Sequence, residues 1–251
     1  MNTRPGKSRI LVRFILMLLL VGSVTAGVVL LFQMLGNEGA DQDGKNAVKQ
    51  PGVFDDSSQA ISIPVIKSPV DFNENGVDDY MDFVIGAREY AAKKPRYDSS
   101  SYFSGGYPPD EVGVCTDVIW QAFKYAGYSL KDMLDTDIRE NPSDYPRITE
   151  PDPNIDFRRV RNLKVYFDKY AASLTTDISE IEEWNAGDIV TSQNPGHISM
   201  ISDKRNADGV PYIIHNGGTA QEANVLKYCD ITGHYRFDAS KIDNGKLIKF
   251  E

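Results

Sequence analysis

Apolar and polar positions divide the chain into an uncharged run, a polar segment and a long region of mixed character. Residues 14–35 contain no charged side chain, and residues 36–60 are polar with only scattered apolar positions. From residue 61 onward, apolar residues recur first at helical spacing and later in short alternating stretches. The pattern predicts a transmembrane anchor at 14–35, a flexible linker at 36–60 and one folded domain at 61–251.

The folded region shows helical periodicity before it shows strand periodicity. Apolar stripes three and four residues apart predict helices at 79–93, 115–126 and 157–172. Four prolines make 137–156 a long predicted surface loop. Strands are expected at 188–191, 197–202 and 211–215, with shorter ones near 234–237 and 246–250. Because helices precede strands that look antiparallel, we expect an α+β fold with N-terminal helices packed on an antiparallel sheet.

The uncharged run has the length of a membrane-spanning helix. Its 22 residues would extend about 33 Å, and a bilayer core is about 30 Å thick. All the basic residues before it lie within residues 1–13, which predicts a cytoplasmic N-terminus and an extracytoplasmic domain. A signal peptide cleaved after 24–26 is the alternative, but the apolar run continues past that point. We therefore expect a single-pass protein of the cell membrane.

Composition excludes several classes of protein. The hydrophobic content of 41% and the charged content of 25% are those of a globular chain, not of a disordered one. Two cysteines are too few for a disulfide scaffold. Acidic residues outnumber basic ones, 36 to 27, for a net charge of -9. A nucleic-acid partner is not expected, because such binding needs a cationic surface.

The segment 71–82, "DFNENGVDDYMD", has the spacing of an EF-hand calcium loop. Oxygen ligands would alternate along it, Gly76 would make the sharp turn, and a carboxylate would close it. The expected ligands are Asp71, Asn73, Asn75, the Val77 carbonyl, Asp79 and Asp82. The final Asp is shorter than the usual Glu, and no helix precedes the loop, as in dockerin-like half-hands. We expect a structural Ca²⁺; a solvated acidic turn capping a helix is the alternative.

A cysteine at a helix start and three histidines form the candidate chemistry. Cys115 opens the second predicted helix, where free N–H groups and the helix dipole favour a thiolate. His197 opens one strand and His215 closes the next, so antiparallel pairing would bring them together. His197 would act as the base, oriented by His215 or by Asn216. The alternative for Cys115 is a small hydrophobic side chain on an apolar stripe.

These motifs resemble those of the NlpC-like cysteine peptidases, a papain-like superfamily of bacterial cell-wall hydrolases. The matching segments are "GVCTDVIWQAF", "WNAGDIV", "GHISMIS" and "YIIHNGG". They look closer still to a group within that superfamily known only as a domain of unknown function, with "GGYPP", "NPSDYP", "PDPNIDFRRVRNL" and "ITGHYRF". The resemblance implies Cys115 as nucleophile, His197 as base, His215 as the third polar residue, and no catalytic cofactor. It implies amide bonds of peptidoglycan peptides as substrate. The family's "DCSG" is "VCTD" here, which leaves the specificity open.

Other readings of the same residues remain. The domain could be a non-catalytic wall-binding module, or an acyltransferase that uses the same thioester. A disulfide between Cys115 and Cys229 would exclude catalysis, and zinc is not expected because paired ligand spacing is lacking. Asp117 is expected either to contact a substrate amine or to cap its helix, and Asn216 is expected to contact the substrate.

Roles outside catalysis are expected for the arginines of 158–161, for Asp188 and for His234. The segment 158–161 carries three arginines, which we expect on a solvated helix face; binding of a substrate carboxylate is the alternative. Asp188 is expected to stabilise the entry of its strand, and His234 to be a packed side chain.

Overall fold

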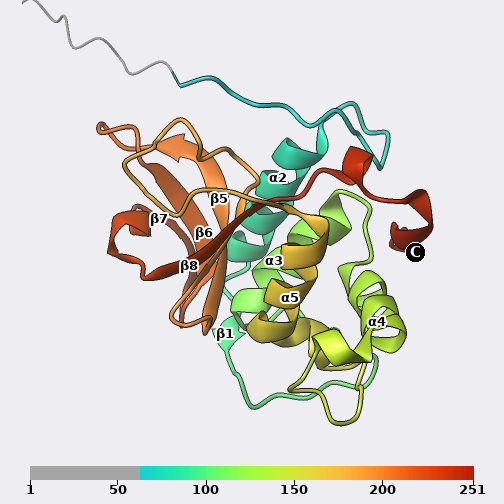
Figure 1. The fold of residues 1–251 in the computed structure, drawn as a ribbon. Coiled ribbons are helices and arrows are strands. Elements are labelled where there is room, and N and C mark those ends of the chain that lie inside the picture. The colour runs from blue at the N-terminus through green and yellow to red at the C-terminus, as the bar shows by residue number, and fades with distance from the viewer. Residues whose placement is uncertain (1–62) are drawn as a thin grey trace, which may run out of the picture. The chain divides into compact units, whose positions relative to one another are not determined.

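A computed structural model describes residues 63–251, which form a mixed α+β fold of four α-helices and an antiparallel sheet (Figure 1). The predicted cytoplasmic segment 1–13 and anchor 14–35 lie outside the described residues, as does the linker 36–60. In the described part of the chain, no helix has the length and apolar character needed to cross a bilayer.

The main sheet has six strands, each antiparallel to its neighbours, in the order β3-β8-β4-β5-β6-β7. The strands are β3 (Ala172–Ser173), β4 (Ile189–Ser192), β5 (His197–Arg205), β6 (Pro211–Asn216), β7 (Ala220–Ala223) and β8 (Ile231–Arg236). A separate parallel pair joins β1 (Arg96–Tyr97) to β2 (Val112–Gly113). Strands β4 to β7 therefore form a meander, and β8 returns to pair with β4.

Two helices, α2 (Asp79–Ala92) and α3 (Cys115–Tyr125), pack on each other and on the sheet (Figure 1). Phe83 and Phe123 are fully buried between them, with ring centroids 4.6 Å apart. Gly86 permits this close approach, because a Cβ there would lie 2.5 Å from the Cβ of Tyr125. Of two further helices, α4 (Leu130–Glu140) packs on α3, and α5 (Val160–Tyr170) packs against the β3–β8 edge of the sheet.

The predicted elements agree with this fold in part. The first two helices are confirmed almost to the residue, and the third is shorter than predicted, beginning at Val160. Helix α4 and strand β7 were not predicted. The strand predicted at 246–250 is wrong: that segment makes only an isolated bridge, from Lys249 to Tyr128.

A buried polar network ties β4 to β8. The Asp188 carboxylate accepts hydrogen bonds from His234 Nε2 at 3.0 Å and from Arg236 Nε at 2.7 Å. The other ring nitrogen of His234 faces the Thr175 carbonyl at 2.7 Å, and the ring stacks on Trp184. His234 is thus buried with a polar partner at each ring nitrogen, which agrees with the structural roles expected of Asp188 and His234.

Candidate active site

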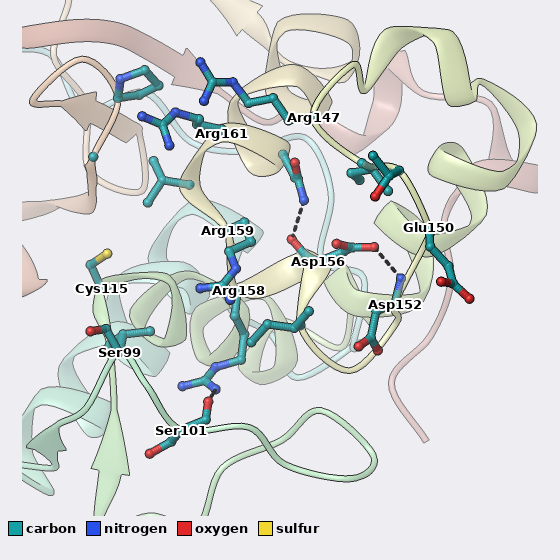
Figure 2. A pocket seen from close by; sticks show the side chains of 18 of the residues that line it. Ser99, Ser101, Cys115, Arg147, Glu150, Asp152, Asp156, Arg158, Arg159 and Arg161 are labelled. Carbon is teal, nitrogen blue, oxygen red and sulfur yellow. Dashed lines mark hydrogen bonds between the residues drawn. The ribbon is translucent and has the colours of Figure 1, made fainter.

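Cys115 is the first residue of α3 and lines a cleft of about 530 Å³ (Figure 2). Its side chain is nearly buried, and the sulfur lies at one side of the cleft. Burial raises the pKa of the thiol to about 11, while backbone N–H groups of Ile198, Thr116 and Cys115 act in the opposite direction. Cys115 and Cys229 are both free thiols, so the disulfide that would exclude catalysis is not formed.

The Val114 residue, directly before Cys115, is held by hydrogen bonds at its N–H and at its carbonyl. The Val114 N–H donates to Asp117 Oδ2 at 2.7 Å, and the Tyr90 hydroxyl donates to the Val114 carbonyl at 3.3 Å. Asn216 Nδ2 in turn donates to the Tyr90 hydroxyl at 3.1 Å. Asn216 is fully buried. The structure therefore places this residue, predicted to contact substrate, where it positions the start of α3 instead.

Asp117 has its carboxylate occupied inside the protein. Arg158 donates to both oxygens, from Nε at 2.8 Å and from Nη2 at 3.0 Å, and Trp120 Nε1 donates to Oδ1 at 2.8 Å. The carboxylate is completely buried and the guanidinium is 2% exposed. Asp117 therefore corresponds to the capping alternative, not to substrate contact. Arg158, expected on a solvated face, is its buried partner.

His197 and His215 form a hydrogen-bonded pair on adjacent strands. His197 Nε2 lies 3.1 Å from His215 Nδ1, and the two rings are perpendicular. Gly217 covers both rings, since a Cβ there would lie 3.4 Å from His215 Nδ1 and 3.7 Å from His197 Cε1. When His197 Nε2 donates in this bond, its Nδ1 keeps a free lone pair that can accept a proton.

The chain on either side of His197 reaches the cleft and the thiol. Pro195 and Gly196, directly before it, line the same cleft as Cys115. Ile198, directly after it, directs its N–H at the thiol. The predicted nucleophile and base therefore belong to one site. Among the described residues, no hydrogen bond joins the thiol to either ring, as is common for catalytic pairs without substrate.

Burial keeps both histidines neutral at physiological pH. It lowers the pKa of His197 to about 4, with a further contribution from the neighbouring His215. Burial also lowers the pKa of His215. Because the thiol pKa is raised, the resting site holds a thiol and an imidazole, and not a thiolate–imidazolium ion pair.

Several cleft residues were not found from the sequence. Tyr97, Ser99, Ser101 and Arg147 line the cleft with Cys115 (Figure 2). Burial raises the pKa of Tyr97, and the negative charges of a Cys115 thiolate and of Asp117 act in the same direction. All four lie in segments without a periodic pattern, so no sequence signal distinguished them.

The 71–82 segment folds as a tight loop around its first carboxylate. Asp71 accepts from the N–H of Asn75 at 3.1 Å and of Gly76 at 2.8 Å, and Gly76 has φ +90. The side-chain amides of Asn73 and Asn75 donate to the Asp82 carboxylate at 2.8 and 3.1 Å. The side chains of Asn73, Asn75 and Asp82 thus meet, whereas Asp71 holds the backbone of the loop.

The remaining predicted ligands do not join this group. Asp79 is fully buried; it accepts from the Phe72 N–H at 2.9 Å and from the Tyr128 hydroxyl at 2.6 Å. Both oxygens are therefore directed into the protein. The N–H of Val77 donates to Asn75 Oδ1 at 2.7 Å. Within residues 63–251, no group of three or more His, Cys, Asp or Glu side chains is arranged to hold a metal ion.

Comparison with known proteins shows the family of this chain. The fold and site define an α+β protein with a cysteine in a cleft and a pair of histidines on adjacent strands. A family model described as a domain of unknown function, DUF1287, matches residues 84–237. The chain belongs to this family. It is also 35% identical over 162 residues, 61% of this chain and 78% of the relative, to Escherichia coli (strain K12) "Uncharacterized protein YijF". No solved structure matches the chain.

Proposed function

We propose that this protein is a cysteine hydrolase of NlpC-like, papain-like fold that cleaves amide bonds. Cys115 is the nucleophile, His197 the general base, and His215 the residue that orients His197. The observation that carries the proposal is the placement of Cys115. Its thiol lies at a helix start in a cleft and is contacted by the backbone N–H of Ile198, the residue after His197. The Nε2 atom of His197 is in turn held by His215.

Each step follows from the neutral resting pair. As Sγ attacks the substrate carbonyl carbon, its proton passes to His197 Nδ1 and a C–S bond forms. The developing oxyanion receives the N–H of Cys115, with the Tyr97 hydroxyl as a second donor. His197 then returns the proton to the departing amine as the C–N bond breaks. Water, deprotonated by His197, cleaves the resulting thioester and restores the thiol.

The surroundings of Cys115 support a preorganised nucleophile. The Val114 peptide is held at its N–H by Asp117 and at its carbonyl by Tyr90. The buried Asp117–Arg158 pair fixes this first turn of α3 against a segment 41 residues away. A position held in this way costs little reorganisation when the reaction begins.

The substrate class and location rest on the family resemblance. We propose peptidoglycan peptides as the amide substrates, reached from a membrane anchor at 14–35 in a bacterial cell envelope. The acidic composition, net -9, gives no support to a nucleic-acid partner.

A structural Ca²⁺ is a further part of the proposal. Oxygens of Asp71, Asn73, Asn75 and Asp82 could converge on the ion if the two amides rotate, because amide nitrogen and oxygen exchange places by such a rotation. Asp79 does not fit this ligand set.

One observation favours a second candidate, a wall-binding module that keeps the fold without catalysis. The thiol is nearly buried, and its pKa is raised to about 11, which makes it a weak nucleophile at rest. A module that only binds peptides does not need a reactive thiol, so Cys115 would stay unmodified during binding.

The test is incubation of the full-length protein with purified muropeptides, followed by mass analysis of the products. We expect cleaved peptides with the wild type and none with Cys115→Ala. Intact peptides in both reactions, together with binding, would favour the module. Amine adducts in place of hydrolysed products would indicate the acyltransferase.

A further inference from the structure

Three arginines converge on the cleft that holds Cys115. Arg159 and Arg161 flank the start of α5, and Arg147 comes from the loop that precedes it; all three are exposed and line the cleft (Figure 2). Arg147 and Arg161 also line the adjoining hollow with Pro195. The arginines therefore gather over one wall of the site although they come from two segments.

These are unusual among the arginines of this structure. Residues 63–251 contain nine arginines, and the side chains of six of them make a hydrogen bond or an ion pair: Arg88, Arg96, Arg139, Arg158, Arg205 and Arg236. Within that range, only Arg147, Arg159 and Arg161 have neither. In a chain of net charge -9, which offers many carboxylates as partners, three unpartnered cations at one cleft require an explanation.

Their position at a helix start adds a second, independent observation. The first turn of α5 contains no acidic residue, and Arg159 is its N-cap. Cations at this end oppose the helix dipole, so the arrangement destabilises α5 unless an anion is bound there. The free N–H groups of the helix start would join the guanidinium groups in holding such an anion.

None of the acidic residues that line the same cleft, Glu150, Asp152 and Asp156, forms an ion pair with the three arginines, although the charge of Arg159 acts to lower the pKa of Asp156, which burial raises. Asp152 accepts from the Tyr102 hydroxyl at 3.0 Å and from the Asn154 N–H at 2.9 Å. Asp156 is buried and accepts from the Asp152 N–H at 2.8 Å. Neither carboxylate forms an ion pair with an arginine of the cleft. In Figure 2 the acidic residues lie on the far side of the arginines from Cys115.

We propose that Arg147, Arg159 and Arg161 bind a carboxylate of an acidic peptide substrate and so place the adjacent amide bond at Cys115. This specificity rests on the proposed hydrolase function. A planar guanidinium matches a carboxylate with two parallel hydrogen bonds, and three of them can hold one or two carboxylates. The structure thus assigns to the three arginines the binding of a carboxylate rather than the solvation of a surface helix.

Binding is tested first, without chemistry, on the full-length Cys115→Ala protein. Calorimetric titration measures the affinity of the protein for three ligands: the acidic peptide acetyl-Glu-Glu-Glu-amide, its neutral analogue acetyl-Gln-Gln-Gln-amide, and inorganic phosphate. We expect the acidic peptide to bind and the neutral peptide not to. Replacing the three arginines by Gln should weaken binding of the acidic peptide by about tenfold or more. The matched control is Arg139→Gln, an exposed arginine of α4 paired with Asp135, which should change nothing.

A second experiment tests whether the positive charge of the three arginines acts at the Cys115 thiol. In Cys229→Ser protein, the rates of Cys115 alkylation by anionic iodoacetate and by neutral iodoacetamide are compared. The ratio should fall about tenfold when the three arginines become Gln, and should be kept when they become Lys. The Lys variant should nevertheless bind the acidic peptide more weakly, because lysine lacks the planar fork.

The two proposals fail in different ways. Equal binding of both peptides, binding unaffected by the Gln variants, or binding of phosphate in preference to the acidic peptide would overturn the carboxylate assignment. If instead the acidic peptide binds through the arginines but muropeptides are not cleaved by the wild type, the assignment stands and the hydrolase function fails.

Discussion

The His197 side chain on β5 lies perpendicular to that of His215 on β6, with Nε2 of the first 3.1 Å from Nδ1 of the second. This hydrogen bond holds the His197 ring at Nε2, so Nδ1 is the nitrogen that remains to accept the proton of the thiol. The pair is also buried, which lowers the pKa of both rings. The orientation and the protonation state of the proposed base therefore have one structural origin.

Removal of His197 should lower the activity more than removal of His215. We expect His197→Ala to lower kcat/KM for muropeptide cleavage by about 100-fold to 10,000-fold, the usual contribution of a general base. His215→Ala should lower it less, because His197 keeps its chemistry and loses only its orientation. Steady-state kinetics by product mass analysis measures both.

The control for these variants is Cys229→Ser, which replaces the other free thiol outside the site. It should retain full activity. Loss of more activity in His215→Ala than in His197→Ala would exchange the roles assigned to the two residues.

The low pKa of His197 predicts activity in acid. A base with a pKa of about 4 instead of 6.5 is still unprotonated at pH 5. The acid limb of kcat/KM should therefore lie well below pH 6. A limb with a midpoint near pH 6.5 would show that His197 titrates as an exposed imidazole and would contradict the buried pair.

The same burial affects stability. Between pH 6.5 and about 4, the unfolded chain binds a proton at His197 that the folded protein does not. The free energy of unfolding should therefore fall as the pH falls through this window. Denaturant unfolding at several pH values should show a shallower decrease in His197→Ala than in the wild type. An equal slope in both proteins would remove His197 as the cause.

The Asp117–Arg158 pair should be strongly coupled to folding. Because both groups are buried, Asp117→Asn leaves an uncompensated cation and should cost about 3–5 kcal/mol in urea unfolding. The matched control is Asp144→Asn, whose ion pair with Lys169 is partly exposed and should contribute less than about 1 kcal/mol. Similar costs for the two variants would contradict the structural role of Asp117.

Calcium should stabilise the protein through the 71–82 loop. A ligand present at ten times its Kd adds about 1.4 kcal/mol, which corresponds to about 3–5 °C in Tm for a domain of this size. Thermal melting with Ca²⁺ and with a chelator measures the shift, and Asp82→Asn should abolish it. An identical Tm with ion and chelator would exclude the structural ion.

The fold was predictable where one local pattern decided an element. Helices α2 and α3 each carry an apolar stripe that faces the core, and both were found. Helix α4 buries Leu130, Leu134 and Ile138, but its charged sequence leads directly into the proline-rich loop, and the stripe was missed. Strand β7, with the sequence AQEA, has little strand propensity and forms by pairing with β6.

The site was predictable only for residues with their own chemistry. Cys115, His197 and His215 could be proposed from the sequence because few residue types perform such reactions. The supporting contacts could not, because they join distant segments: Asp117 meets Arg158, and Asn216 reaches Tyr90 126 residues away. Such pairs depend on the packed fold, and no spacing along the chain indicates them.

The central claim is that Cys115 forms a covalent acyl intermediate, and rapid-quench mass analysis of the full-length protein tests it most directly. The protein is incubated briefly with muropeptides and the reaction is stopped with acid. We expect a fraction of the protein to carry an acyl group. Peptide fragmentation should map this group to Cys115, and hydroxylamine should release it. The adduct should be absent in Cys115→Ala and form far more slowly in His197→Ala. Cleavage of muropeptides that continues in Cys115→Ala would contradict the account.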